Sequence, residues 1–172
     1  IGGITVTEER REEMSFSVTY YESPVVMVTK GQDNAGSTLS DLAGKKVGVM
    51  TASIQAVMMP KLIPDAEYME FNSISDMIAA LNSNKIDAFG CDESLYTSML
   101  WEGQSVDRID EPIDKSNYGL IFQKGKKLEL QNEVNEFIAT ISADGTLKAL
   151  EEKWFGAKEP TEFASYENLN GT

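Results

Sequence analysis

Two arginines near the start of the chain stand where a cation is unexpected. Thr7 is a good N-cap, and the two glutamates after it suit the positive end of the helix that would begin there. Arg10 and Arg11 fall in or next to the same first turn, where a positive charge is disfavoured. Either both are solvated charges on an amphipathic turn, or one guanidinium joins backbone N–H groups and Thr5 to hold a carboxylate in two hydrogen bonds.

A carboxylate midway along the chain has two interpretations as well. Asp92 follows residues 87–91, which are expected to form a strand. Sheets in α/β proteins place ligand contacts at the carboxyl ends of their strands, so Asp92 is a candidate ligand-binding residue. It can equally serve as the N-cap of the helix that is expected from about Glu93 to Trp101.

Several kinds of chemistry are excluded by composition. The 172 residues include no histidine and one cysteine, Cys91, so a histidine-assisted nucleophile and an internal disulfide are impossible within this chain and a zinc site is nearly excluded. We predict no catalytic residue, no metal and no cofactor. The net charge of −13, with no basic stripe, argues against nucleic acid as a partner.

Short apolar strands alternate with helical periods, which predicts an α/β fold. No stretch approaches the ~20 apolar residues that would cross a bilayer. The expected strands are residues 25–28, 46–50, 68–71, 87–91 and 118–123. The expected helices are residues 53–60, 74–81 and 93–101, then a long helix through Val134, Phe137, Ile138 and Ile141, and a last one that ends before Gly156.

Several motifs together resemble a known family. They are GGITVTEERREEMSFSVTYYES at residues 2–23, LAGKKVGV at 42–49, NKIDA at 84–88 with Asp92, YGL at 118–120, and DGT at 144–146 with KWFG at 153–156. In this order the sequence resembles family 3 of the bacterial extracellular solute-binding proteins, the polar-amino-acid receptors of ABC importers. The resemblance covers almost the whole chain to Gly156.

The resemblance implies the type II periplasmic-binding-protein fold, in which two α/β lobes joined by two crossing strands trap a ligand between them. Residues 1–29 and 118–157 would form part of lobe one, residues 30–117 would form lobe two, and residues 158–172 would be a linker or tail. Lobe one would be incomplete, because relatives begin with further strands and a helix that would precede Ile1.

The family's ligand contacts can be carried over to matching positions. The resemblance implies that Arg10 grips the ligand's α-carboxylate, that Thr5 assists it, and that the backbone of Gly3 faces the α-ammonium group. Asp92 matches the aspartate that accepts hydrogen bonds from this ammonium group. An arginine and an aspartate on opposite lobes would complement the two charges of a zwitterion.

The turn after the second strand departs from the family pattern. Thr51 and Ser53 match a strand-to-helix turn whose backbone amides also point at the carboxylate. Ala52 stands where the family has glycine, and Ile54 replaces a small or hydroxylated residue, which narrows the pocket and leaves the ligand class open. Ser53 can equally be a simple N-cap.

An incomplete lobe one would leave apolar side chains without partners. Phe137, Trp154 and Phe155 are expected to belong to its core. We therefore expect the chain to self-associate or to swap segments with a second copy.

Three functions fit this pattern. The first is an extracellular or periplasmic module, tethered to the cell surface in the whole protein, that captures an amino acid for an ABC permease without covalent chemistry. The second is the ligand-binding domain of a membrane sensor, whose binding physics would be the same. The third is an enzyme on the same fold, which the absence of histidine and the retention of both zwitterion-binding groups disfavour.

Overall fold

The chain divides into two compact units in a computed structural model that describes residues 2–31 and 37–156. Of the described residues, 2–23 and 116–156 form the first unit, and 24–31 and 37–115 form the second. Two strands cross from one unit to the other: β2 (Tyr21–Lys30) does so after Ser23, and β6 (Val106–Tyr118) does so after Lys115. The predicted tail at 158–172 lies outside the described residues, and the assignment of the two lobes stays a prediction.

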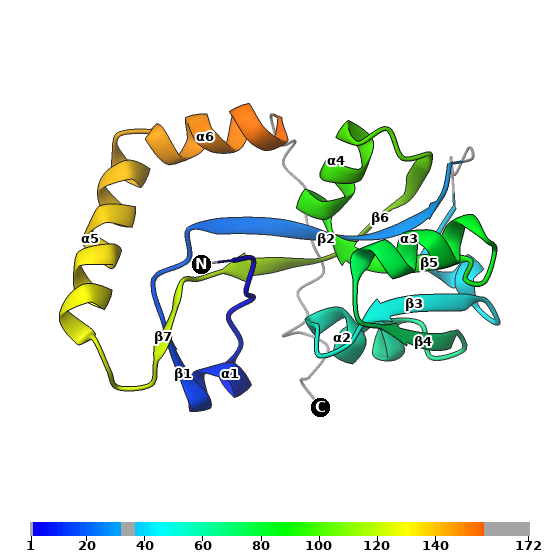
Figure 1. Cartoon of the computed structure of the whole chain (residues 1–172), viewed down its shortest axis with the longest axis horizontal. Helices are drawn as coiled ribbons and strands as arrows, with labels where there is room; N and C mark the ends of the chain where they lie inside the picture. The colour runs from blue at the N-terminus through cyan, green and yellow to red at the C-terminus, as the bar shows by residue number, and fades with distance from the viewer. Residues whose placement is uncertain (1, 32–36, 157–172) are drawn as a thin grey trace. The chain divides into compact units, whose positions relative to one another are not determined.

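A five-stranded sheet with the order β4-β3-β5-β2-β6 organises the second unit (Figure 1). β3 (Lys46–Met50) runs parallel to both β4 (Glu67–Phe71) and β5 (Ala88–Asp92), whereas β2 runs antiparallel to β5. The α/β class is therefore confirmed. Asp92 is the last residue of β5, so this strand ends one residue later than predicted.

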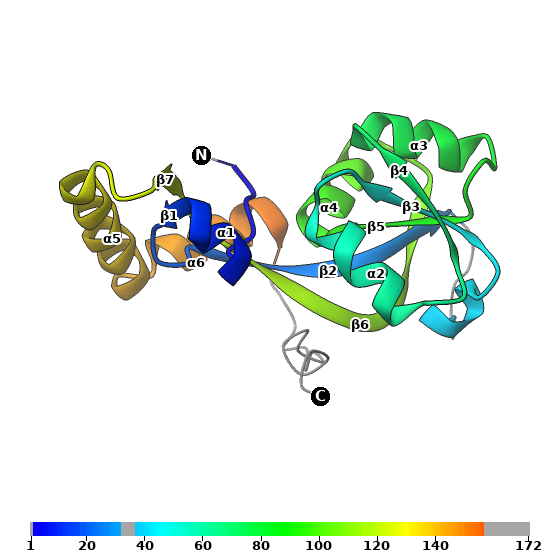
Figure 2. The same cartoon turned by 90° about the horizontal axis from the view of Figure 1, so that it is seen from below.

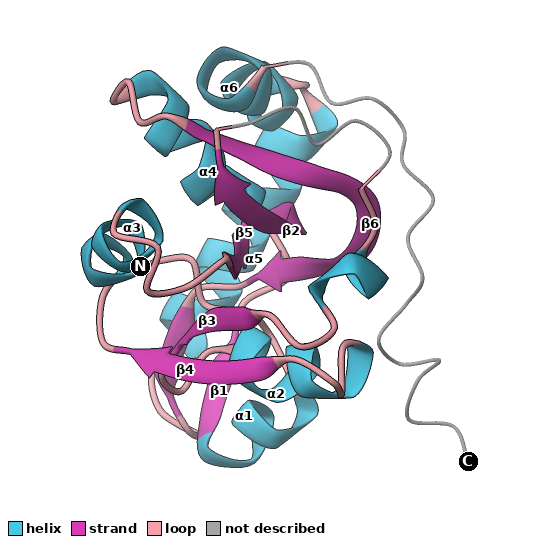
Figure 3. Cartoon of the chain, turned by 90° about the vertical axis from the view of Figure 1, so that its right-hand side faces the viewer, coloured by secondary structure: helices cyan, strands magenta, loops and turns pink. Residues whose placement is uncertain are grey.

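Helices cover both faces of this sheet (Figures 2 and 3). Alternate residues of β2 point to opposite faces: Val25 and Met27 belong to one core cluster, and Val26 and Val28 belong to the other. The first cluster includes α2 (Ile54–Leu62) and the short 3₁₀ helix η1 (Leu39–Leu42). The second cluster includes α3 (Ile74–Asn82) and α4 (Glu93–Trp101).

Serine N-caps fix where two of these helices begin. Ser53 Oγ accepts a hydrogen bond from Ala56 N at 3.2 Å before α2, and Ser73 Oγ accepts one from Asp76 N at 3.1 Å before α3. The α2 helix continues two residues past Pro60, the residue near which it was predicted to end. A proline inside a helix removes one hydrogen bond without always ending the helix.

The sequence analysis missed strand β6 except for its last residue, Tyr118. Its residues VDRIDEPIDKSNY are largely polar and contain Pro112, which has no N–H to donate. β6 is the last strand in the sheet order, and an edge strand tolerates both features. Ile109 and Ile113 are nevertheless buried in the first core cluster.

The first unit contains a small antiparallel sheet and three helices. α1 (Glu8–Glu13) leads into β1 (Met14–Phe16), which pairs with β7 (Ile121–Gln123). α5 (Leu128–Ala143) and α6 (Thr146–Phe155) follow. The strand predicted at 118–123 is thus divided between the end of β6 and β7.

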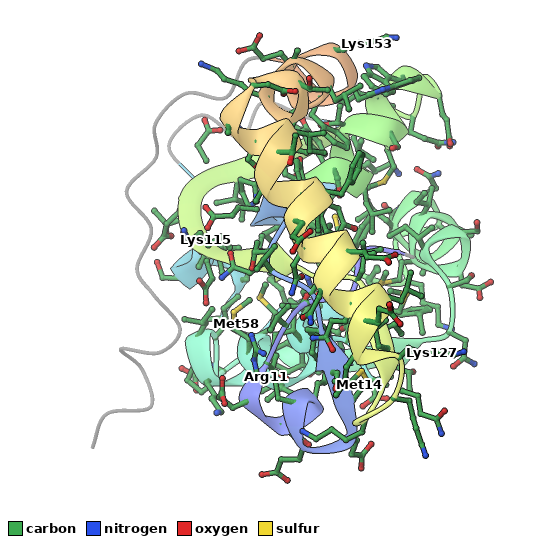
Figure 4. All side chains as sticks on the ribbon, turned by 90° about the vertical axis from the view of Figure 1, so that its left-hand side faces the viewer. Arg11, Met14, Met58, Lys115, Lys127 and Lys153 are labelled. Carbon is green, nitrogen blue, oxygen red and sulfur yellow. The ribbon has the colours of Figure 1, made fainter. Side chains whose placement is uncertain are left out.

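Side chains of α5 attach this helix to the small sheet, and Figure 4 marks Arg11 and Met14 near the sheet and Lys127 where α5 begins. Gln131 Nε2 donates to the Phe16 carbonyl oxygen at 2.7 Å, and Val18 N donates to Asn135 Oδ1 at 2.9 Å. These hydrogen bonds leave much of the helix surface uncovered by described residues of this unit.

Large apolar side chains are exposed in the first unit. Phe137 is 63% exposed and Trp154 is 53% exposed, as expected for side chains without partners. The expectation was wrong for Phe155, whose ring lies 4.9 Å from that of Tyr21. Other exposed apolar side chains of this unit are Val18, Ile121, Leu128, Leu130 and Leu150. No helix among the described residues has the length and apolar character of a membrane span.

Candidate ligand-binding site

The two neighbouring arginines of α1 have different surroundings. Arg10 Nη1 donates to the main-chain carbonyl of Thr5 at 2.9 Å, which ties the guanidinium group to the segment before the helix. Arg11 instead forms an exposed ion pair with Glu8, with Nε 3.5 Å from Oε1, and its guanidinium carbon lies 5.8 Å from the centre of the Phe16 ring. Arg10, to which the family resemblance assigns the carboxylate contact, is thus held by the segment before α1, and its role in ligand binding stays a prediction.

Residues 3–6 are fixed against the end of β6. Thr5 is buried and forms an isolated antiparallel bridge with Tyr118. Val6 N donates to the Asn117 carbonyl at 2.8 Å. A Cβ atom on Gly3 would lie 3.1 Å from two carbons of the Tyr118 ring, so the close packing of this ring favours glycine. The first unit thus brings Gly3, Thr5 and Arg10 together.

Asp92 in the second unit occupies the N-cap position of α4 without acting as a cap. Its side chain makes no capping hydrogen bond to the helix. Its Oδ1 accepts a hydrogen bond from Gln55 Nε2 at 3.1 Å. The N-cap interpretation, which the sequence had allowed, therefore does not account for this carboxylate.

The turn between β3 and α2 lies next to Asp92, at the carboxyl ends of the central strands. β3 and β5 are parallel neighbours, with Val47 opposite Ala88 and Gly48 opposite Phe89, so their carboxyl ends meet there. The turn contains the predicted residues Thr51, Ser53 and Ile54. Thr51 is exposed, and Ile54 is partly buried.

Ser53 and Ala52 give this turn its shape. The Ser53 hydroxyl accepts the capping hydrogen bond of α2, so its role as an N-cap is confirmed, and its part in ligand binding stays a prediction. Ala52 has φ 59°, in the left-handed region that favours glycine. The family glycine at this position therefore has a conformational reason, and alanine adopts the same backbone with strain.

The thiol of Cys91, the residue before Asp92 in β5, is buried and unreactive. Cys91 belongs to the second core cluster, and burial raises the pKa of its thiol. The thiolate is the reactive form, so this cysteine is inert packing. Within the described residues, no group of three or more His, Cys, Asp or Glu side chains is placed to hold a metal ion.

The predicted site residues thus form two groups, one in each unit. Gly3, Thr5 and Arg10 come together in the first unit, and Thr51, Ser53, Ile54 and Asp92 come together in the second. A clamp that combines Arg10 with Asp92 stays a prediction. Sequence reasoning did not identify Gln55 as a functional residue, although it directly follows the predicted turn.

Fold and sequence comparisons define the class of protein. The α/β architecture matches solved structures of type II periplasmic binding proteins. One of them, an ancestral arginine-binding protein bound to glutamine, is 30% identical with a TM-score of 0.78, and the match covers 90% of this chain and 69% of that protein.

The chain belongs to the bacterial extracellular solute-binding proteins, family 3, whose profile matches residues 1–157. It is 26% identical over 162 residues to the ABC transporter glutamine-binding protein GlnH of Bacillus subtilis (strain 168). It is 29% identical over 159 residues to the L-cystine-binding protein TcyJ of Escherichia coli (strain K12). These matches cover 94% and 91% of this chain, but the chain spans only 59% of the length of each relative.

Proposed function

We propose that the protein captures a polar amino acid by binding its two charges with two preformed groups of residues. Arg10, assisted by Thr5, binds the α-carboxylate, together with the backbone amides at the start of α2. Asp92 accepts hydrogen bonds from the α-ammonium group, and the backbone of Gly3 contributes on the other side. The observation that carries the proposal is that Asp92 occupies an N-cap position and does not cap its helix.

Electrostatics gives the reason that both groups are needed. A bidentate contact between a guanidinium group and a carboxylate is a strong, directional interaction. A partly desolvated ammonium group without an anionic partner is costly. A zwitterion that bridges Arg10 and Asp92 neutralises both the guanidinium group and the carboxylate. A ligand with a single charge neutralises only one of these two groups. Capture of this kind requires no bond making or breaking, which agrees with the binding-protein names of the relatives.

The ligand class that fits is a polar amino acid. Glutamine and cystine are the ligands in the names of the two relatives, and glutamine is bound in the ancestral structure. Ile54 places a β-branched apolar side chain where the family has a small or hydroxylated one. We therefore expect the ligand pocket at the start of α2 to be narrower than the family pattern implies and to offer fewer side-chain hydroxyl groups.

Delivery to an ABC permease from an extracellular or periplasmic position, with a tether to the cell surface, completes the proposal. The family's description and the transporter name of the GlnH relative support this arrangement. A membrane sensor would bind ligand by the same physics.

Calorimetric titration with L-glutamine, L-arginine and L-cystine tests the capture function. Arg10→Ala is expected to weaken binding by about 2–5 kcal/mol, because it removes a charge-assisted clamp. Arg11→Ala is the matched control, since it deletes the same charge one residue away, where the side chain pairs with the exposed Glu8. We expect this control to lose less than about 0.5 kcal/mol. Equal losses from the two variants would remove Arg10 from the site.

A further inference from the structure

A buried glutamine interrupts the apolar face of α2. Gln55 is 5% exposed and lies on the helix that buries Met58 and Met59 almost completely against the sheet. A carboxamide in such a position costs free energy unless it is hydrogen-bonded. Its Nε2 donates to Asp92 Oδ1 at 3.1 Å, so the polar side chain reaches the end of β5 from beneath the helix.

The side chains on the same face of β5 are small enough to permit this approach. Residues 88, 90 and 92 share a face of the strand, because side chains alternate. Ala88 belongs to the core cluster beneath α2, whereas Phe89 and Cys91 belong to the cluster on the opposite face. A Cβ atom on Gly90 would lie 3.0 Å from Met59 Cε and 3.6 Å from Gln55 Cβ, so glycine at this position lets α2 pack close to the strand.

We propose that Gln55 is a positioning residue that orients the Asp92 carboxylate for the α-ammonium group of the ligand. This inference rests on the proposed function of Asp92. An N-cap aspartate is normally held by a capping hydrogen bond to the first turn of its own helix, and Asp92 makes no such hydrogen bond to α4. The amide of Gln55 is a fixed donor from a neighbouring helix, and a charge-assisted hydrogen bond of this kind holds the plane of the carboxylate.

A positioning role confers selectivity for an amine over a hydroxyl group at the α-carbon. The ammonium group requires a correctly oriented carboxylate acceptor, whereas a 2-hydroxy acid makes a weaker, neutral hydrogen bond to it. Loss of Gln55 should therefore weaken the binding of the amino acid much more than the binding of the matching 2-hydroxy acid. A purely structural role would weaken both ligands equally.

Titration of Gln55→Met with L-arginine and with argininic acid, its 2-hydroxy analogue, measures this difference. We expect the affinity for L-arginine to fall about tenfold and the affinity for argininic acid to change less than about twofold, as for the loss of one hydrogen bond to a charged group. Gln131→Met is the matched control, because Gln131 also donates a hydrogen bond through Nε2, to the Phe16 carbonyl at 2.7 Å, and lies in the other unit. It should change neither affinity. Equal weakening of both ligands by Gln55→Met, or no weakening, would overturn the proposal.

A second measurement needs no ligand and separates the two proposals. The side-chain amide protons of Gln55, followed by NMR, should exchange slowly with water in the unmodified chain and rapidly after Asp92→Ala. Exchange of the side-chain amide protons of Gln131 should be the same in the unmodified chain and in Asp92→Ala. Rapid exchange of the Gln55 amide in the unmodified chain would refute its positioning role even if amino acids bind. Slow exchange together with no binding of any amino acid would refute the capture function alone.

Discussion

Ala52 adopts φ 59° in the turn before α2, and its replacement by glycine is expected to stabilise the second unit. An L-residue in the left-handed region costs about 1–2 kcal/mol. Glycine avoids that cost but loses about 0.5–1 kcal/mol more backbone entropy on folding. The difference predicts that Ala52→Gly raises the free energy of unfolding by about 0.5–1 kcal/mol.

The same substitution elsewhere in the unit provides a control with the opposite sign. Ala79 is exposed in the interior of α3, where the backbone is helical. Ala79→Gly is expected to lower the free energy of unfolding by about 1 kcal/mol, since it brings only the entropic cost and the low helix propensity of glycine.

Urea unfolding followed by circular dichroism, together with hydrogen exchange of the β3 and β5 amides, measures both variants. Hydrogen exchange assigns the change to the second unit, since the two units need not unfold together. The slope against urea should stay constant, because neither change alters the buried surface. If Ala52→Gly destabilises the unit as much as Ala79→Gly does, the strain at residue 52 is not real and the conformational reason for the family glycine fails.

Two further predictions concern other parts of the chain. Tyr68 donates from its hydroxyl to two main-chain carbonyls, those of Met59 and Ile63, at 2.7 and 2.9 Å, so Tyr68→Phe should lower the free energy of unfolding by about 1 kcal/mol at neutral pH. Burial raises the pKa of Tyr68 from 10.0 to about 12, and the folded state therefore favours the neutral phenol. This stabilisation is complete below pH 10 and is lost as the pH rises towards about 12, so chemical denaturation of the two proteins at a series of alkaline pH values should show their difference shrinking. The exposed apolar side chains of the first unit predict self-association, and light scattering should give a mass above the 19.0 kDa of one chain. Phe137→Ser combined with Trp154→Ser should reduce that mass; a monomer at high concentration in the unmodified chain would contradict the prediction.

The order of helices and strands was largely predictable, because burial on one face leaves a periodic pattern. The stripe of α3 and the strands β3, β4 and β5 follow directly from it. β6 was not predictable in this way, since its sequence is largely polar and contains a proline. Periodicity therefore identified the apolar strands, including β4 at one edge of the sheet, and missed most of the largely polar strand β6 at the other edge.

The candidate site shows a different limit of sequence reasoning. Asp92 and Ser53 each had a capping and a ligand-binding interpretation, and the sequence treats them alike. The structure separates them: Ser53 caps its helix, and Asp92 does not. Gln55 was missed because residue type alone does not show whether a glutamine side chain is buried or solvated. The available signal was Gly90, which removes a side chain from the strand face that α2 covers.

The candidate site residues of each unit are held by hydrogen bonds within that unit, and this preorganisation favours tight binding of a small ligand. Arg10 is tied to the Thr5 carbonyl, and Asp92 is tied to the Gln55 amide. The entropy of ordering these side chains is therefore spent on folding and not on binding. In the proposed clamp, the remaining cost is that of bringing the two charged side chains to one ligand, and a molecule with both an anionic and a cationic group offsets this cost most fully. The proposed clamp therefore favours a zwitterion such as an amino acid over a simple acid or a simple amine.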